Sequence, residues 1–315
     1  MQAVLEGAST DHTRRDRRSI AAPWPPSYTL NMKPARKPER AVKLTVIQPR
    51  SVLNRSGMGG FTLNPYQGCT VGCAYCYVPH MKHKQLEERK WGTYVDVKEG
   101  VPELLDKQLG RLRQPTRVFM STATDPYQPV EERYQITRRI LEVFERHPQH
   151  SLFILTKQTL VERDADLIAR LPRAAVGMSI SVIDDRLSDI IEPWAAPTSG
   201  RLATIRRLSE RGIATYVLWA PAFVPVPMSR EFVRDAMTKI AESRTQALSL
   251  DSLNYRSRQP AGLPRRLARD GHAPATAAQV ELLRQEARRH GLARRLDLVA
   301  PESEIAELQP LLPFE

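Results

Sequence analysis

One short segment holds every cysteine of this 315-residue chain, and it reads Asn64-Pro65-Tyr66-Gln67-Gly68-Cys69-Thr70-Val71-Gly72-Cys73-Ala74-Tyr75-Cys76-Tyr77. Its thiols follow the spacing C-x3-C-x2-C. Three thiolates spaced in this way can bind three irons of a cubane 4Fe-4S cluster, while the fourth iron stays open to a small molecule. The segment therefore predicts a metal centre with Cys69, Cys73 and Cys76 as its ligands.

A zinc site is one alternative reading of the cysteines, because His80 or His83 lies close enough in sequence to supply a fourth ligand. Zinc loops do not usually carry the Asn-Pro-Tyr sequence that precedes Cys69 here. A disulfide framework is a weaker alternative, since an odd number of cysteines cannot pair fully.

The composition is that of an ordinary globular protein, with 41% hydrophobic and 26% charged residues. The length suits one large domain with extensions, or two modest ones. Residues 216–228 are apolar, but prolines interrupt them and they fall short of the roughly 20 residues that a membrane helix needs. Residues 1–18 are polar and arginine-rich, unlike a signal peptide. We therefore expect a cytoplasmic protein with no membrane segment.

The formal net charge of +12 favours a polyanionic partner such as a nucleic acid. The excess lies at the two ends of the chain. Residues 1–50 hold ten Lys and Arg against four acids, and residues 256–295 hold ten Arg against three acids. An arginine-rich genome composition would account for part of this excess without any function, so both readings stay open.

The chain is expected to divide into three regions. Residues 1–50 are basic and rich in proline and predict a largely disordered extension, apart from a short strand at residues 42–46. Residues 51–255 predict the core domain. Residues 256–315 predict a basic linker, which includes residues 260–274, and a helical C-terminal region.

Strands and helices alternate through the predicted core. Apolar runs predict strands at residues 118–121, 151–156, 175–181, 214–219 and 247–250, and helical patterns cover residues 134–146, 164–171 and 198–211. Residues 276–290 also have helical composition. Such alternation produces a parallel sheet through right-handed crossovers. The predicted fold class is α/β, an open, partial TIM-like parallel β/α barrel that carries the cluster loop.

Polar residues follow several of these strands at the point where each strand ends. Ser121 and Asp125 follow one strand, Lys157 follows the next, and Ser179 lies near the end of another. Chemistry in β/α barrels takes place at the carboxyl ends of the strands. These residues are therefore candidates for a site beside the cluster loop.

The amino-acid sequences of the motifs also resemble those of a known family. Asn64-Pro65-Tyr66-Gln67-Gly68-Cys69, the pair Cys76-Tyr77, and the downstream Ser121-Thr122-Ala123-Thr124-Asp125-Pro126-Tyr127-Gln128-Pro129 resemble the spore photoproduct lyase-like branch of the radical S-adenosylmethionine (SAM) superfamily. The resemblance covers roughly residues 50–225. It implies two cofactors, a 4Fe-4S cluster and SAM, and a low-potential electron donor such as flavodoxin or ferredoxin.

The resemblance also implies a reaction. One electron from the cluster cleaves SAM into methionine and a 5′-deoxyadenosyl radical, which abstracts hydrogen from a substrate, while the protein orients and shields the cofactors. Tyr75 would then support the adenine end of SAM, and Lys157 would bind its carboxylate. Ser179 and Ser121 would donate hydrogen bonds to its ribose or methionine part. The alternatives are that Tyr75 only packs over the loop, that Lys157 is a surface lysine, and that the serines cap helices.

Two further residues are candidates for catalysis. Tyr77 matches a tyrosine that follows the last cysteine in spore photoproduct lyases and is associated there with radical transfer. Asp125 belongs to the second motif and is predicted to lie in an active-site loop, although a Thr-Asp-Pro sequence also starts helices well.

One departure from the family pattern concerns the hydrogen donor. Spore photoproduct lyases use an additional cysteine for this step, and this chain has no fourth cysteine. Repair of a thymine dimer by that thiol route is therefore not expected.

Three functions remain open from the sequence. The leading one is a radical SAM enzyme, lyase-like, that acts on DNA or a nucleotide, as in DNA repair. The second is a radical SAM enzyme that acts on a small molecule or peptide. The third is a nucleic-acid-binding protein with a structural metal loop.

Overall fold

The computed structural model describes residues 27–32, 40–57, 59–81, 89–253 and 262–292. Within these residues the largest sheet consists of β3 (Leu53–Arg55), β4 (Phe61–Leu63), β7 (Arg117–Met120), β8 (Ser151–Thr156), β9 (Ala174–Ile180), β10 (Ala214–Trp219) and β12 (Ala247–Leu250). Their order across the sheet is β12-β10-β9-β8-β7-β4-β3. Neighbouring strands from β4 to β12 run parallel, and β3 is antiparallel to β4. The predicted α/β class and open, partial barrel are confirmed.

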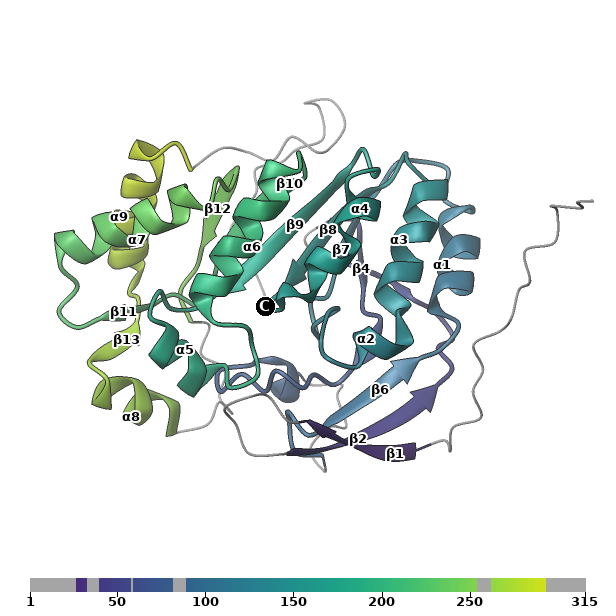
Figure 1. The fold of residues 1–315 in the computed structure, drawn as a ribbon, viewed down its shortest axis with the longest axis horizontal. Helices are drawn as coiled ribbons and strands as arrows, with labels where there is room; N and C mark the ends of the chain where they lie inside the picture. The colour runs from purple at the N-terminus through teal and green to yellow at the C-terminus, as the bar shows by residue number, and fades with distance from the viewer. Residues whose placement is uncertain (1–26, 33–39, 58, 82–88, 254–261, 293–315) are drawn as a thin grey trace, which may run out of the picture.

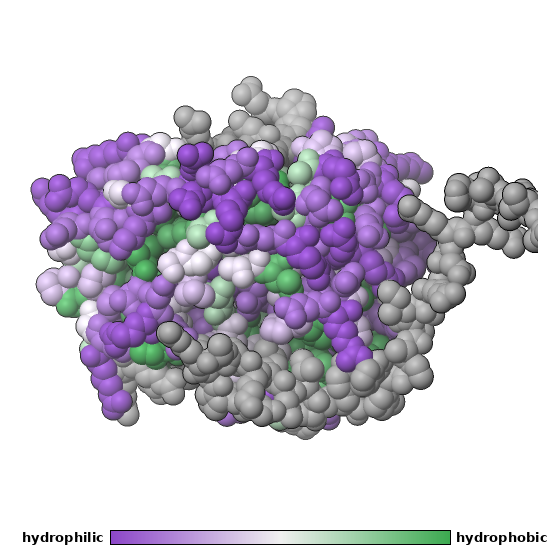
Figure 2. All heavy atoms as spheres, in the orientation of Figure 1, coloured by the Kyte–Doolittle hydropathy of each residue, from purple (hydrophilic) through white to green (hydrophobic). Residues whose placement is uncertain are grey.

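Helices cover one face of this sheet (Figure 1). They are α1 (Val101–Leu109), α3 (Ile136–Arg146), α4 (Ala165–Ile168), α6 (Thr198–Glu210) and α7 (Arg230–Glu242). The helices α2 (Glu131–Tyr134) and α5 (Asp185–Ile191) and the short 3-10 helices η1 (Val78–His80) and η2 (Thr159–Asp164) lie in the connections between the other elements. Their outer surface is mainly hydrophilic, and hydrophobic residues show in a recessed band across its middle (Figure 2).

The local sequence explains where these elements start and which side they bury. Asp184 precedes α5, and its side chain accepts a hydrogen bond from the backbone N–H of Leu187, at 2.7 Å. Ser229 caps α7 in the same way, which satisfies amides that have no partner inside the helix. Every residue of β9 is buried, as expected for a strand covered on both faces.

A second, smaller sheet lies beneath the edge at which β7, β8 and β9 end (Figure 1). It is built from β1 (Ser27–Met32), β2 (Arg40–Ile47), β6 (Tyr94–Lys98) and β5 (Tyr66–Gln67), in the order β1-β2-β6-β5. Because β5 belongs to the cysteine segment, its antiparallel pairing with β6 brings that segment to the carboxyl ends of the large sheet.

Two expectations about the ends of the chain need correction. Within the extension predicted to be largely disordered, residues 27–32 and 40–47 form β1 and β2, which pair along their length. Within the predicted linker, α8 (Gly262–Arg269) precedes β13 (His272–Pro274), and β13 pairs with β11 (Phe223–Pro225). The short strand predicted at residues 42–46 is confirmed as part of β2, whereas β1, α8 and β13 were not predicted. Composition missed β13 because its partner strand, β11, is distant in sequence. The boundaries at residues 50 and 255 stay predictions.

The C-terminal region contributes to the packing around the cysteine segment. Leu263 and Leu267 of α8 belong to a small apolar cluster with Tyr75 and Phe223, against which Cys73 packs. The predicted helix at residues 276–290 is confirmed as α9 (Ala277–Arg289) and starts with a capping box. In the part of the chain that the structure describes, no helix is long and apolar enough to cross a membrane.

Gly177 provides a test of the packing that sets the position of Ser179. A methyl group on Gly177 would lie 2.2 Å from the ring of Tyr216 on the neighbouring strand. We predict that Gly177→Ala lowers the free energy of unfolding by about 1–3 kcal/mol, the usual cost of overpacking a core. Gly57→Ala is the control, because nothing lies within 4 Å of the added methyl group. Equal denaturant midpoints for the two variants would contradict the packing described here.

Candidate active site

The three cysteines lie in one loop between β5 and η1. Cys69 is buried, and Cys73 and Cys76 are half-buried. Burial raises the pKa of Cys69 and of Cys73 well above the usual range, and the charges of neighbouring cysteines add to the increase in both. The thiols are therefore close enough to act on one another, as ligands of one cluster must be.

Within the described residues, no set of three His, Cys, Asp or Glu side chains is compact enough to hold a single metal ion. A cubane cluster presents a separate iron to each thiolate, so its ligands stand farther apart than those around one ion. Of the two histidines considered as zinc ligands, His80 lies in η1 and His83 lies outside the described residues.

Gly68 allows the loop to turn directly before the first cysteine. Its φ of +80° lies in the left-handed region, which favours glycine. A Cβ at this position would lie 2.6 Å from the carbonyl oxygen of Tyr94 on β6. The loop can therefore approach the small sheet this closely only with glycine here.

The second motif, which follows β7, holds the cysteine loop through hydrogen bonds. The side-chain oxygen of Gln128 accepts from the backbone N–H of Thr70, at 3.0 Å. The hydroxyl of Thr124 donates to the carbonyl of Gly68, at 2.6 Å. The side-chain oxygen of Asn64 accepts from the backbone N–H of Ala123, at 2.9 Å. The two motifs that carried the family resemblance are thus parts of one structural unit.

Asp125 joins the ends of β7 and β8. One carboxylate oxygen accepts from the backbone N–H of Tyr127, at 2.9 Å, and from the hydroxyl of Thr156, at 2.7 Å. The other accepts from the backbone N–H of Lys157, at 2.8 Å. Burial raises the pKa of Asp125 although these three bonds oppose the shift. The described contacts are those of a residue that positions two strand ends, and a catalytic role for Asp125 stays a prediction.

Tyr77 and Ser121 differ in how their hydroxyl groups are engaged. The hydroxyl of Tyr77 donates to the carbonyl of Thr122, which anchors the end of the cysteine loop to the second motif. Ser121 is buried, has a φ of 75°, and its hydroxyl has no hydrogen-bond partner among the described residues. A strained backbone and a buried unpaired hydroxyl are both typical of functional positions.

Two of the predicted cofactor-binding residues, Tyr75 and Lys157, bond one buried carboxylate, and a third, Ser179, bonds Lys157. The ammonium group of Lys157 lies 2.8 Å from the hydroxyl of Ser179 and 2.7 Å from a carboxylate oxygen of Glu192. The hydroxyl of Tyr75 donates to the same oxygen of Glu192. Lys157 also lies 5.6 Å from the centre of the Tyr75 ring, within the range of a cation–π contact. The structure therefore brings Tyr75, Lys157 and Ser179 together.

Glu192 itself was missed by the sequence analysis, as was its partner Arg201. Both side chains are fully buried, and they form an ion pair. Burial alone would raise the pKa of Glu192, but Arg201 and Lys157 together hold it well below its usual range. No local motif marks either residue, because Glu192 follows α5 and Arg201 lies on α6. Only the fold brings them together.

This buried network lies beside the cysteine loop. The backbone N–H of Ala74 donates to the carbonyl of Ile191, at 2.8 Å, one residue before Glu192. The charges of Lys157, Glu192 and Arg201 all act on the thiol of Cys73. The network therefore lies within electrostatic reach of a cluster ligand.

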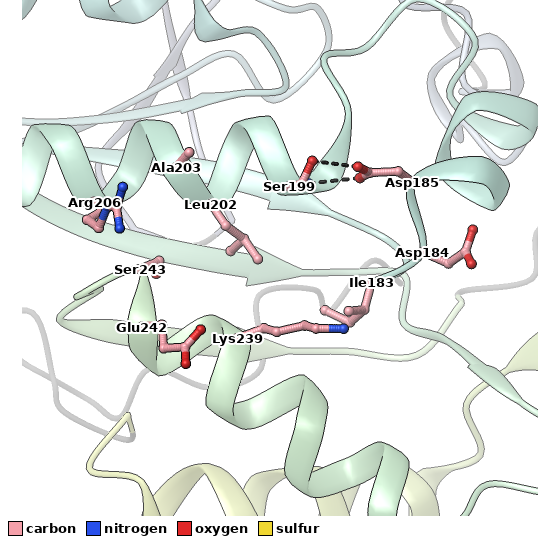
Figure 3. Close-up of a pocket in the computed structure, with 10 residues that line it drawn as sticks. All are labelled: Ile183, Asp184, Asp185, Ser199, Leu202, Ala203, Arg206, Lys239, Glu242 and Ser243. Carbon is pink, nitrogen blue, oxygen red and sulfur yellow. Dashed lines mark hydrogen bonds between the residues drawn. The ribbon is translucent and has the colours of Figure 1, made fainter.

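A hollow of about 520 Å³ lies elsewhere, in the outer layer of helices (Figure 3). Its polar lining includes Asp184, Arg206, Lys239 and Glu242, from α6, α7 and the residues that precede α5. Figure 3 shows Ser199 bonded to Asp185 at its rim. None of the predicted site residues lines this hollow, so it is separate from the chemistry proposed at the cysteines.

Comparison with known proteins places these features in a family. The family model of the radical SAM superfamily matches residues 63–220. An uncharacterised protein of Methanocaldococcus jannaschii is 30% identical over 194 residues, which cover 61% of this chain and 72% of that protein. A protein of Pseudomonas phage M6 named radical SAM Nalpha-GlyT isomerase is 26% identical over 178 residues, or 56% of this chain and 36% of that protein.

Solved structures agree with this placement at the level of the fold. Spore photoproduct lyase complexed with dinucleoside spore photoproduct superimposes with a TM-score of 0.57, at 16% identity and over 78% of each chain. A variant of the same lyase with bound AdoMet and dinucleoside spore photoproduct gives a TM-score of 0.54 at 15% identity, again over 78% of each chain. With the family model spanning the cysteine loop and the buried network, this chain belongs to the radical SAM superfamily, whose enzymes use a 4Fe-4S cluster and SAM.

Proposed function

We propose that this enzyme reductively cleaves SAM and uses the resulting 5′-deoxyadenosyl radical to abstract hydrogen from a nucleic acid or nucleotide. The observation that carries the proposal is the convergence of Lys157, Ser179 and Tyr75 beside the thiol of Cys73. That convergence supplies groups suited to SAM beside the loop that would hold the cluster. The third function considered above was a nucleic-acid-binding protein with a structural metal loop. Because the chain belongs to an enzyme superfamily, that function is not needed to explain the cysteines.

The residues present fit both cofactors. Three thiols in one loop form the donor set for three irons. The ammonium group of Lys157 suits the carboxylate of SAM, the hydroxyl of Ser179 suits its polar groups, and the ring of Tyr75 suits its adenine. Ser121 contributes a buried hydroxyl that is free to bond a ligand. When bound, the cofactors supply the radical chemistry, and the protein holds and shields them.

Glu192 would determine where Lys157 points. Its carboxylate holds the ammonium group against Ser179, so little side-chain freedom is left for a ligand to restrict on binding. Tyr77, anchored at Thr122, remains the proposed radical-transfer residue, and Asp125 remains the proposed catalytic residue of the second motif.

The nucleic-acid substrate rests on two supporting observations. The chain carries a net charge of +12, and it shares the fold of a lyase whose structure holds a dinucleoside photoproduct. The arginines of α9 contribute little to a free basic surface, because Arg288 pairs with Glu281 and Arg289 with Glu286. The basic excess available to phosphates would therefore lie mainly in residues 1–50, with ten Lys and Arg against four acids, and in residues 256–270, with five Arg against one acid. A small-molecule or peptide substrate is the alternative.

The remaining partners follow from the chemistry. Cluster reduction needs a low-potential donor, and flavodoxin or ferredoxin is proposed for this step. A cytoplasmic location is proposed because it provides the reducing surroundings that an exposed cluster requires.

Lys157→Met is predicted to weaken SAM binding about 10- to 100-fold, because hydrogen bonds to charged groups contribute about 1.5–3 kcal/mol. Binding would be measured anaerobically by calorimetry on protein with its cluster assembled. Lys239→Met is the matched control: Lys239 is an exposed lysine of α7 that pairs with Asp235 and should leave SAM affinity unchanged. Equal affinities for both variants and the unaltered protein would rule out Lys157 as a SAM ligand.

Two substitutions at Ser121 separate ligand binding from backbone strain. Ser121→Gly removes the hydroxyl and relieves the positive φ, so we predict an unfolding free energy raised by up to about 1 kcal/mol together with weaker SAM binding. Ser121→Ala should weaken binding similarly without the gain in stability. Unchanged SAM affinity in both variants would reduce Ser121 to a purely structural residue.

The proposed function is tested by anaerobic cluster reconstitution, reduction, addition of SAM and chromatography for 5′-deoxyadenosine, beside a Cys73→Ala control. Product is expected only from the unaltered protein. Substrates deuterated in the nucleoside would then be screened, because transfer of deuterium into 5′-deoxyadenosine identifies the molecule that loses hydrogen. A protein that binds zinc in place of a cluster and forms no product would refute the enzyme reading.

The role of the basic segments is tested by replacing Arg14, Arg15, Arg17, Arg18, Arg256 and Arg258 with glutamine, which alters no described element. Nucleic-acid affinity should fall, and its dependence on salt should become shallower, because fewer counterions are released. Formation of 5′-deoxyadenosine should stay intact. Unchanged affinity and salt slope would favour a small-molecule or peptide substrate.

A further inference from the structure

The small sheet forms a wall against the first half of the cysteine loop. Tyr94 of β6 lies against Gly68, where an added Cβ would be 2.6 Å from both its ring and its carbonyl oxygen. Arg40, the first residue of β2, donates to the carbonyl of Thr70 and lies near Gly72. The guanidinium group of Arg40 also stacks 4.2 Å from the ring of Trp194. Both side chains are thus held in place beside Cys69.

Each of these residues has a buried donor without an acceptor. The hydroxyl of Tyr94 and the Nε of Arg40 are inaccessible to solvent, and neither has a hydrogen-bond partner among the described residues. Tyr94 is only 1% exposed. Folded proteins rarely leave buried donors unpaired, so each such group needs an explanation, and a bound ligand is one.

Both groups lie within electrostatic range of the cysteine thiols. The charges of Cys76 and Cys69 act on the hydroxyl of Tyr94, and the charge of Cys69 acts on Arg40. Burial lowers the pKa of Arg40 only to about 10, so its guanidinium group remains charged at neutral pH. A phenol and a guanidinium group therefore face the loop that supplies the thiolates.

We propose that Tyr94 and Arg40 donate hydrogen bonds to the sulfur atoms of the cluster held by Cys69, Cys73 and Cys76, and thereby raise its reduction potential. Hydrogen bonds to cluster sulfurs and nearby positive charge are known determinants of that potential. Reduction adds negative charge to the cluster, and both groups stabilise negative charge, so they favour the reduced form. The proposed hydrogen bonds from Tyr94 and Arg40 rest on the presence of the 4Fe-4S cluster in the proposed function. They do not depend on which substrate the enzyme uses.

The test is an anaerobic redox titration of the reconstituted protein without SAM, followed by electron paramagnetic resonance. Tyr94→Phe removes only the hydroxyl, and Arg40→Gln removes the charge. Each is expected to shift the midpoint potential to more negative values. A tenfold fall in the equilibrium constant for reduction corresponds to a shift of about 59 mV for a one-electron couple. Iron and sulfide content would be matched before titration.

Tyr216→Phe is the matched control. It also removes one tyrosine hydroxyl, but that hydroxyl donates to the carbonyl of Ile154, at 3.1 Å, and no cysteine affects its pKa. Its midpoint potential should equal that of the unaltered protein. Fully loaded Tyr94→Phe and Arg40→Gln proteins with unchanged potentials would overturn the proposal.

A second measurement tests the proposal even if the variants do not fold or do not take up the cluster. Resonance Raman spectra of the unaltered protein, recorded in H2O and in D2O, report hydrogen bonds to the sulfurs through the iron–sulfur stretching bands. Bands that shift in D2O support donors at the sulfurs. Bands that do not shift would overturn the proposal without any substitution.

Discussion

The buried carboxylate of Glu192 is the constraint around which the site is organised. A carboxylate without contact with water is costly unless cations and hydrogen bonds compensate it. Arg201, Lys157 and Tyr75 provide that compensation from three different parts of the chain. Because each partner must reach the same two oxygen atoms, α6, the end of β8 and the cysteine loop are fixed relative to one another. The geometry around Cys73 follows from this requirement.

The cysteine loop is held on its other side by neutral hydrogen bonds. Gln128 and Thr124 of the second motif bond its backbone, and Gly68 allows it to lie directly on β6. A loop held from several directions by buried contacts has few conformations of its own, so its three thiols are arranged before metal arrives. Cluster binding then costs less ordering entropy than it would in a free loop.

The sequence predicted the fold and part of the site well, for identifiable reasons. Buried strands such as β8 and β9 have continuous apolar patterns. Lys157 follows β8 and Ser179 lies near the end of β9, so their meeting could be expected from parallel topology alone. Glu192 and Arg201 could not be found in this way, because a buried ion pair between a helix end and a helix face leaves no periodic pattern. The helix α8 was missed because it packs against a distant segment that includes Tyr75. The strand β1 was missed because the proline-rich, charged sequence around it predicts disorder.

The contact between α8 and the cysteine loop has a consequence for how the protein matures. Tyr75 and Cys73 pack against a cluster that includes Leu263 and Leu267, which are among the last described parts of the chain to leave the ribosome. Until α8 is synthesised and folds, this side of the loop lacks part of its apolar cover. Burial of Cys73 therefore depends on a helix that is synthesised long after the loop itself, so the loop cannot reach its final packing while the chain is only partly made.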